Sequence, residues 1–312
     1  MNFLLFDYKG EFSDIQNSHW LALFDVDRSC ILDPLTQPLP FTPFKDFTGR
    51  SINEINLYST EMSSALCSID RVSASANMNN RLSEAIVEAY KSTNGTPISF
   101  ELMLKCYQSR MKDANNDDSI SSVLKQLVNA HIFESEDKVS LIDDSYIIKM
   151  DGYPKDGPIA KAIVYFLMSK LNNIYELLDK QAVNDEVVQI RHFSIIDEAH
   201  YMLDFDNRPL RNLIAVGRNK GLSIILATQN MSSFKSKGFD FYANAQYPLI
   251  MKQQTIDDKV IKDLFGVSGQ ELQEIRTAIA GLQKGELIIK DQMAFALGMG
   301  NKYKKINVTH LI

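Results

Sequence analysis

Two kinds of hydrophobic pattern occur along the chain, and they alternate in its second half. Short apolar runs at residues 3–6, 193–196 and 222–227 are typical of strands buried on both faces of a parallel sheet. Residues 159–178 instead carry apolar side chains on one helical face. The alternation predicts an α/β fold in which a mainly parallel sheet is flanked by helices.

The same reasoning predicts the remaining elements of this core. Asn207 is a good helix cap, and Pro209 suits the first turn of a helix that runs to about residue 216. Further strands are expected at 146–150, 247–252 and 285–290, and further helices at 256–265 and 269–280.

The pattern changes between residues 29 and 143. Four prolines between residues 32 and 47 predict an extended loop. Helices are expected at 53–67, 79–90, 99–111 and 119–130, and a small hairpin at 132–142. We interpret 29–143 as a mainly helical insertion between the start of the core at 1–28 and its remainder at 144–312. A separate winged-helix-like module is the alternative.

Composition limits the class of protein. A chain of 312 residues with 45% hydrophobic residues can bury a substantial core. The net charge of −6 argues against a uniformly basic DNA-coating protein, although an oligomer could still form a basic channel. Three widely spaced cysteines support neither a zinc site nor a disulfide framework. No apolar run approaches the ~20 residues of a membrane helix, so we expect a cytoplasmic protein with no membrane partner.

Acidic and amide side chains follow three of the predicted strands. Asp7 follows the first strand, Asp197 and Glu198 follow the second, and Gln229 follows the third. Because the carboxyl ends of parallel strands meet at one edge of the sheet, these side chains are expected to lie together. Adjacent carboxylates suit metal-assisted attack of water on a nucleotide. The alternative is that Asp197 and Glu198 merely begin a solvated loop.

Four segments in the same order resemble the HerA/FtsK group of P-loop ATPases. Residues 194–200 (SIIDEAH) and 217–229 (GRNKGLSIILATQ) resemble the second half of that group. Residues 5–11 (LFDYKGE) are similar to its D-x-K-G-E segment, and residues 285–289 (GELII) resemble its late strand. The group includes TraG-like coupling proteins and DptH-like proteins of restriction systems. The resemblance implies a RecA-like core.

The resemblance also assigns roles to residues of the predicted edge. It implies that Asp197 holds Mg²⁺ or its water shell, that Glu198 is the general base for the attacking water, and that Gln229 senses the γ-phosphate of ATP. His200 follows the carboxylates, and a structural or coupling role suits it better than metal binding, since no second ligand stands at the required spacing.

Three further residues have weaker assignments. Arg218 is a candidate arginine finger for the nucleotide of a neighbouring subunit, but an arginine at a helix end also stabilises the helix dipole. Asp7 and Lys9 are expected to line the cofactor site, or else to form an ion pair within a turn. Gln229 could also be a plain polar residue at the end of a strand.

The chain departs from the family in one respect. It contains no G-x-x-x-x-G-K-[ST] segment, whose backbone amides and lysine hold the phosphates of a nucleotide, and it has no Gly-Lys dipeptide. In the family this loop precedes the D-x-K-G-E strand, so we expect the missing piece before Met1. The chain by itself is expected to bind ATP poorly.

The resemblance implies an ATP-driven DNA translocase or helicase-like motor, with DNA as partner and a hexameric ring as assembly. A restriction or anti-phage system with further protein partners is a suitable setting. The alternative is a scaffold that keeps the fold without hydrolysing ATP. Lysines that could contact DNA phosphates stand at 235, 237, 302, 304 and 305, although clusters of this size are usually solvated surface.

Overall fold

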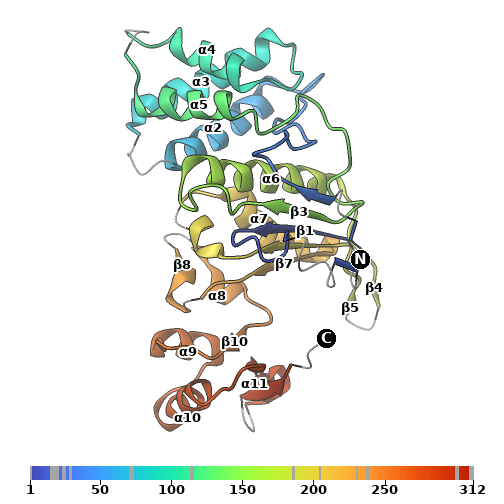
Figure 1. Cartoon of the computed structure of the whole chain (residues 1–312), viewed down its shortest axis with the longest axis vertical. Helices are drawn as coiled ribbons and strands as arrows, with labels where there is room; N and C mark the ends of the chain where they lie inside the picture. The colour runs from blue at the N-terminus through green and yellow to red at the C-terminus, as the bar shows by residue number, and fades with distance from the viewer. Residues whose placement is uncertain are drawn as a thin grey trace. The chain divides into compact units, whose positions relative to one another are not determined.

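The computed structural model describes most of the chain in two compact units (Figure 1). The units are Met1–Ala227 and Thr228–Ile312, and each is considered by itself. The described residues are 2–14, 21–22, 26–27, 30–69, 74–112, 116–184, 187–203, 205–229, 231–236, 239–298 and 302–308.

A five-stranded parallel sheet forms the centre of the first unit. Its strands, in spatial order, are β2 (Ile31–Leu32), β3 (Tyr146–Lys149), β1 (Asn2–Asp7), β6 (His192–Ile196) and β7 (Leu222–Leu226). The register places Phe6 beside Ile196, and Ile196 beside Leu226. The α/β class and the parallel sheet predicted from the sequence are therefore confirmed.

One face of the sheet packs against helix α6 (Pro158–Leu177). Leu4, Phe6 and Ile196 are fully buried on this face, and the Ser194 hydroxyl lies 3.8 Å from the sulfur of Met168 in α6. Helix α7 (Arg208–Val216) packs beside α6, and the Asn207 side chain caps it as expected by accepting a hydrogen bond from the Leu210 N–H. In Figure 1, α6 lies between the sheet and the helices of the insertion.

The insertion contains the expected helices: α2 (Ile52–Ile69), α3 (Ala76–Ser92), α4 (Phe100–Gln108) and α5 (Ser119–Ala130). Polar caps explain where three of them begin. The side chains of Ser75, Ser99 and Asp118 accept hydrogen bonds from N–H groups of the following first turn. Asp118 and Ser121 form a capping box, so local sequence largely determines these helices.

The hairpin expected at 132–142 is wrong. This segment pairs instead with the proline-rich loop, because Leu39 forms an isolated parallel bridge with Phe133. The Leu39 N–H donates to the Ile132 carbonyl at 2.7 Å, and the Glu134 N–H donates to the Leu39 carbonyl at 3.0 Å. The winged-helix-like alternative consequently lacks its wing.

The second unit contains a three-stranded antiparallel sheet of β10 (Leu249–Met251), β11 (Glu286–Lys290) and β12 (Tyr303–Asn307). Helices α9 (Asp258–Phe265) and α10 (Gly269–Ala280) share a buried core with this sheet. The shorter elements of the chain are β4 (Val183–Asn184), β5 (Val187–Val188), η3 (Ala199–Met202), η4 (Gly217–Lys220), η5 (Met231–Phe234), β8 (Lys235–Ser236), β9 (Phe239–Asp240), α8 (Phe241–Asn244) and α11 (Gln292–Leu297).

None of the helices among the described residues is long and apolar enough to cross a membrane. The three cysteines are free thiols, and Cys106 is the buried one among them. Burial raises the pKa of Cys67 to about 12, so this thiol is protonated at neutral pH.

His192 is a buried histidine at the start of β6. The residue is 1% exposed, and among the described residues neither ring nitrogen has a hydrogen-bond partner. Burial lowers its pKa from 6.5 to about 4, because the charged imidazolium would lose its hydration. The unfolded chain therefore binds a proton between pH 6.5 and 4 that the folded chain does not bind.

This difference predicts a loss of stability in acid. The contribution of His192 is present above pH 6.5 and is lost as the pH falls towards 4, amounting to about 3 kcal/mol. When the free energy of unfolding in urea is measured across this pH range, its decrease towards acid should be smaller in His192→Phe than in the wild type by about this amount. The exposed His131 provides the control variant His131→Asn, whose profile should follow the wild type. Parallel profiles for all three proteins would contradict the assignment.

Candidate active site

The carboxyl ends of β1 and β6 lie side by side and bring the predicted acidic residues together. Phe6 and Ile196 are register partners, so Asp7 and Asp197 leave the sheet next to each other. The Asp197 N–H donates to the Phe6 carbonyl at 3.3 Å. Beyond it, the Ala199 N–H donates to the Ala227 carbonyl at 2.8 Å, just past the end of β7. The sheet edge expected from the sequence therefore exists.

Asp7 organises the loop that follows β1. Its carboxylate is fully buried and accepts hydrogen bonds from the N–H groups of Gly10, Phe12 and Ser13 at 2.9, 3.0 and 2.8 Å. The Ser13 hydroxyl donates a further bond at 2.8 Å. Gly10 has a φ of +74°, and a Cβ at this position would meet the Asp151 carboxylate at 2.7 Å. The geometry gives Asp7 a structural role in shaping residues 8–13.

The Lys9 side chain extends from this loop to Glu198. The ion pair expected within the turn, between Lys9 and Asp7, is therefore replaced by one between Lys9 and Glu198. Its ammonium nitrogen lies 2.7 Å from Oε1 of Glu198. This hydrogen bond is the main cause of a raised pKa of Lys9, which burial opposes. The Glu198 side chain is only 4% exposed, whereas that of Lys9 is 30% exposed. The Glu198 carboxylate is therefore held inside the protein by a cation from the loop that follows β1.

His200 contacts the second oxygen of the same carboxylate. Its Nδ1 lies 3.3 Å from Oε2 of Glu198. The imidazole also packs on Tyr201 with ring centroids 4.1 Å apart, and Tyr201 lies 5.9 Å from Tyr8. The loop after β1 and the turn after β6 are thus joined by an ion pair and by ring contacts. The structural or coupling role expected of His200 stays a prediction.

Asp197 is the carboxylate at this edge that suits a magnesium ion. It is half-buried, and burial raises its pKa, an effect that the charge of Lys9 opposes. Carboxylate oxygen is the ligand type that Mg²⁺ prefers, and this ion usually keeps several waters. Within the described part of the chain, no group of three or more His, Cys, Asp or Glu side chains could hold a metal. The site thus fits Mg²⁺ that is held chiefly by water and substrate.

The structure separates Arg218 from these carboxylates. Arg218 is exposed in η4, immediately before β7, and therefore lies at the amino edge of the sheet. The five residues of β7 span about 17 Å between the two edges. Gln229 follows β7 but belongs to the second unit, so its predicted place beside Asp197 stays a prediction.

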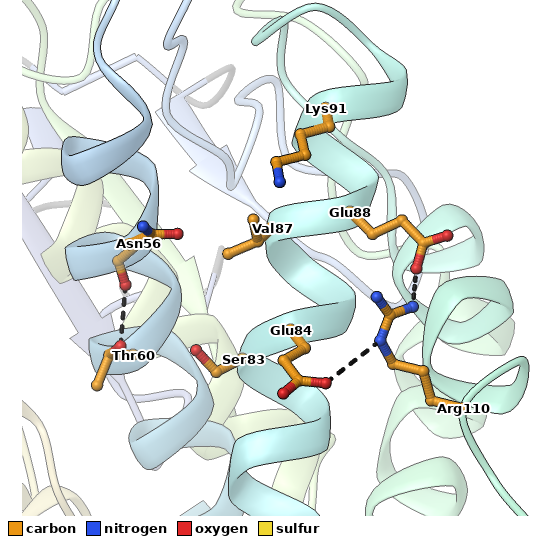
Figure 2. Close-up of a pocket in the computed structure, with 8 residues that line it drawn as sticks. All are labelled: Asn56, Thr60, Ser83, Glu84, Val87, Glu88, Lys91 and Arg110. Carbon is orange, nitrogen blue, oxygen red and sulfur yellow. Dashed lines mark hydrogen bonds and ion pairs between the residues drawn. The ribbon is translucent and has the colours of Figure 1, made fainter.

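A separate groove lies in the helical insertion and encloses about 400 Å³ (Figure 2). Its lining residues are Asn56, Thr60, Ser83, Glu84, Val87, Glu88, Lys91 and Arg110. Figure 2 shows Arg110 directed towards two carboxylates of α3, with 3.7 Å to Glu84 and an ion pair to Glu88. These charges pair with one another, and the groove shares no residue with the carboxylate edge.

Comparison with known proteins identifies the fold. No family model matches the chain, and no curated protein matches its sequence significantly. Among solved structures, VirB4 of Thermoanaerobacter pseudethanolicus aligns with a TM-score of 0.66 at 15% identity, over 99% of this chain and 82% of that one. The chain has the fold of VirB4. Its core is RecA-like, as the resemblance implied.

Two structures of the conjugative coupling protein TrwB give the same result. TrwBΔN70 with sulphate has a TM-score of 0.59 at 13% identity, over 99% of this chain and 78% of that one. TrwB with the ATP analogue ADPNP has a TM-score of 0.52 at 14% identity, over 99% and 85%. The match to a coupling protein agrees with the resemblance to the TraG-like group. At sequence identities this low, the structural matches establish the fold alone. The chemistry depends on the residues of the site.

The loop held by Asp7 generates a prediction about stability. Asp7→Asn replaces one acceptor oxygen by an amide donor that faces other donors. The free energy of unfolding in urea should fall by about 2–4 kcal/mol, because buried N–H groups lose charge-assisted partners. The exposed Asp143 provides the matched control Asp143→Asn, which should stay within about 0.5 kcal/mol of the wild type. An equally small effect at both positions would contradict this account of the loop.

Proposed function

We propose that the chain belongs to an ATP-driven motor that moves DNA. The observation that carries the proposal is the Asp197–Glu198 pair at the carboxyl edge of β6, beside Lys9 of the loop after β1, in a fold shared with VirB4 and TrwB. Adjacent carboxylates at this edge of a parallel sheet suit hydrolysis of a nucleotide.

Each residue has a role in this proposal. Glu198 takes the proton of the attacking water, and Asp197 would hold Mg²⁺ through its water shell. Mg²⁺, when bound, neutralises charge on the phosphates. Gln229 senses the γ-phosphate, and Lys9 lines the phosphate side of the site, with Asp7 holding the loop that carries it. TrwB has been solved with ADP and Mg²⁺, which supports this choice of ligands.

DNA and a ring assembly belong to the proposal on the strength of the resemblance. A restriction or anti-phage setting is proposed on the same basis. The lysines of the second unit give little support, since Lys302, Lys304 and Lys305 pair with carboxylates at 3.3, 2.8 and 2.7 Å. Lys237 lies outside the described residues. Translocation would therefore require basic surface that the assembled form creates.

A second function is favoured by the missing phosphate-binding segment. Without G-x-x-x-x-G-K-[ST], the chain has no recognised loop to hold the phosphates of ATP. Under this alternative it is a scaffold that keeps the fold and contributes an interface, or Arg218, to an active partner. DNA-stimulated ATP hydrolysis, measured for this chain and for a form extended upstream, distinguishes the two. Absence of ATP hydrolysis in both forms would favour the scaffold.

Glu198→Gln tests the proposed base in the form that hydrolyses ATP. Turnover should fall about 100- to 10,000-fold because the amide cannot accept the proton from water. ATP binding, measured by calorimetry, should be retained. The exposed Glu136 provides the control variant Glu136→Gln, which should leave the rate unchanged. Unchanged hydrolysis in Glu198→Gln would remove this residue from the mechanism.

Arg218→Ala tests the proposed arginine finger. Because Arg218 and Glu198 lie at opposite ends of the strands, Arg218 could act only on a nucleotide bound by another copy of the chain. The variant alone should lose about 1,000-fold or more in turnover. Mixing it with Glu198→Gln should restore part of the activity, because some interfaces then combine an intact Glu198 with an intact Arg218. Arg50→Ala, at an exposed position of the insertion, is the control. Mixtures that stay inactive would contradict a role across the interface.

A further inference from the structure

The position of Glu198 does not suit direct attack by water. Both carboxylate oxygens have neighbours, with Lys9 at 2.7 Å and His200 at 3.3 Å, and the side chain is 4% exposed. Its backbone is left-handed, with φ 49° and ψ 41°, a conformation that costs a non-glycine residue about 1–3 kcal/mol. A general base needs a free lone pair within reach of water. The contacts therefore hold the side chain in a place where it does not act.

Lys9 is well placed to control this position. Its backbone belongs to the loop that Asp7 fixes through the N–H groups of Gly10, Phe12 and Ser13. The lysine side chain is 30% exposed, so it is in contact with both the buried carboxylate and the solvent at the sheet edge. A flexible side chain on a rigid loop can exchange one anion for another without any change in the fold.

We propose that Lys9 is the positioning residue of Glu198, and that phosphate oxygens of the nucleotide compete with Glu198 for its ammonium group. This inference rests on the proposed function, because it presupposes phosphate at this edge. Without phosphate, Lys9 keeps the carboxylate inside the protein and away from water. With phosphate, the ammonium pairs with the more highly charged anion, and Glu198 turns towards the solvent. Hydrolysis of a nucleotide whose phosphates do not reach Lys9 is thereby prevented.

The first experiment measures whether a reagent reaches Glu198 in the full chain. A water-soluble carbodiimide with glycinamide labels accessible carboxylates, and mass spectrometry of peptides quantifies labelling at Glu198 relative to the exposed Asp143. Labelling should be low in the wild type, several-fold higher in Lys9→Met and close to the wild type in Lys9→Arg. Lys149→Met is the matched control, since Lys149 lies at the same edge but pairs with Asp33. Equal labelling in Lys9→Met and the wild type would overturn the proposal.

Pyrophosphate with Mg²⁺ then serves as the competing anion, added to the upstream-extended form because the chain by itself is expected to bind ATP poorly. At concentrations that saturate its binding in calorimetry, Glu198 labelling should rise several-fold in the wild type and should not rise further in Lys9→Met. Binding without a rise in labelling overturns the exchange. Absence of binding contradicts the proposed phosphate site instead, and the comparison of Lys9→Met with Lys9→Arg then decides the positioning role alone.

A double-mutant cycle distinguishes loss of the contact between Lys9 and Glu198 from a general loss of folding. Lys9→Met should lower the urea midpoint of the wild type, because it leaves the Glu198 carboxylate buried without its cation. The same substitution in a Glu198→Gln background should shift the midpoint much less. Equal shifts in both backgrounds would show that Lys9 acts on the fold independently of Glu198, and would overturn the proposal.

Discussion

The parallel pairing of β1 with β6 is the constraint on which the candidate site depends. Its register sets Phe6 beside Ile196, so two segments far apart in the sequence leave the sheet together. A shift by one residue would turn every side chain of the strand to the opposite face. Fully buried Leu4, Phe6 and Ile196 oppose such a shift, since they pack on the same side of the sheet. The hydrophobic core therefore also fixes the place of Lys9 relative to Glu198.

Buried charge is tolerated at this edge because each group has a defined partner. The Asp7 carboxylate accepts hydrogen bonds from backbone N–H groups and so fixes the conformation of the loop. Glu198 occupies a left-handed backbone position that would be unfavourable for an isolated glutamate, and Lys9 compensates its buried carboxylate. Asp197 has a raised pKa because burial outweighs the nearby cation. One lysine thus affects both carboxylates that the proposed reaction uses.

Sequence reasoning succeeded where structure is local and failed where it is not. The helix at residues 119–130 was predicted correctly because the capping residue Asp118 and the apolar periodicity agree. The hairpin at 132–142 was not, because Phe133 pairs with the distant Leu39 and no local signal marks that pairing. Strand β12 was missed because it is largely exposed and its sequence shows no alternation of apolar and polar residues. At the site, the sheet edge was foreseen, whereas the ion pair between Lys9 and Glu198 depends on the strand register.

The places of Glu198 and Arg218 have a consequence for assembly under the proposed function. The carboxylate lies at the carboxyl edge of the sheet and the arginine at the amino edge, about 17 Å apart along β7. An arginine stabilises a phosphoryl group only at hydrogen-bond distance, so Arg218 can serve only a nucleotide held by another copy. Such a contact joins two different surfaces. Repeated head to tail, contacts of this kind close into a ring or continue as a filament. Under the proposed function, the opposed edges of one sheet therefore favour a head-to-tail assembly over a two-fold dimer.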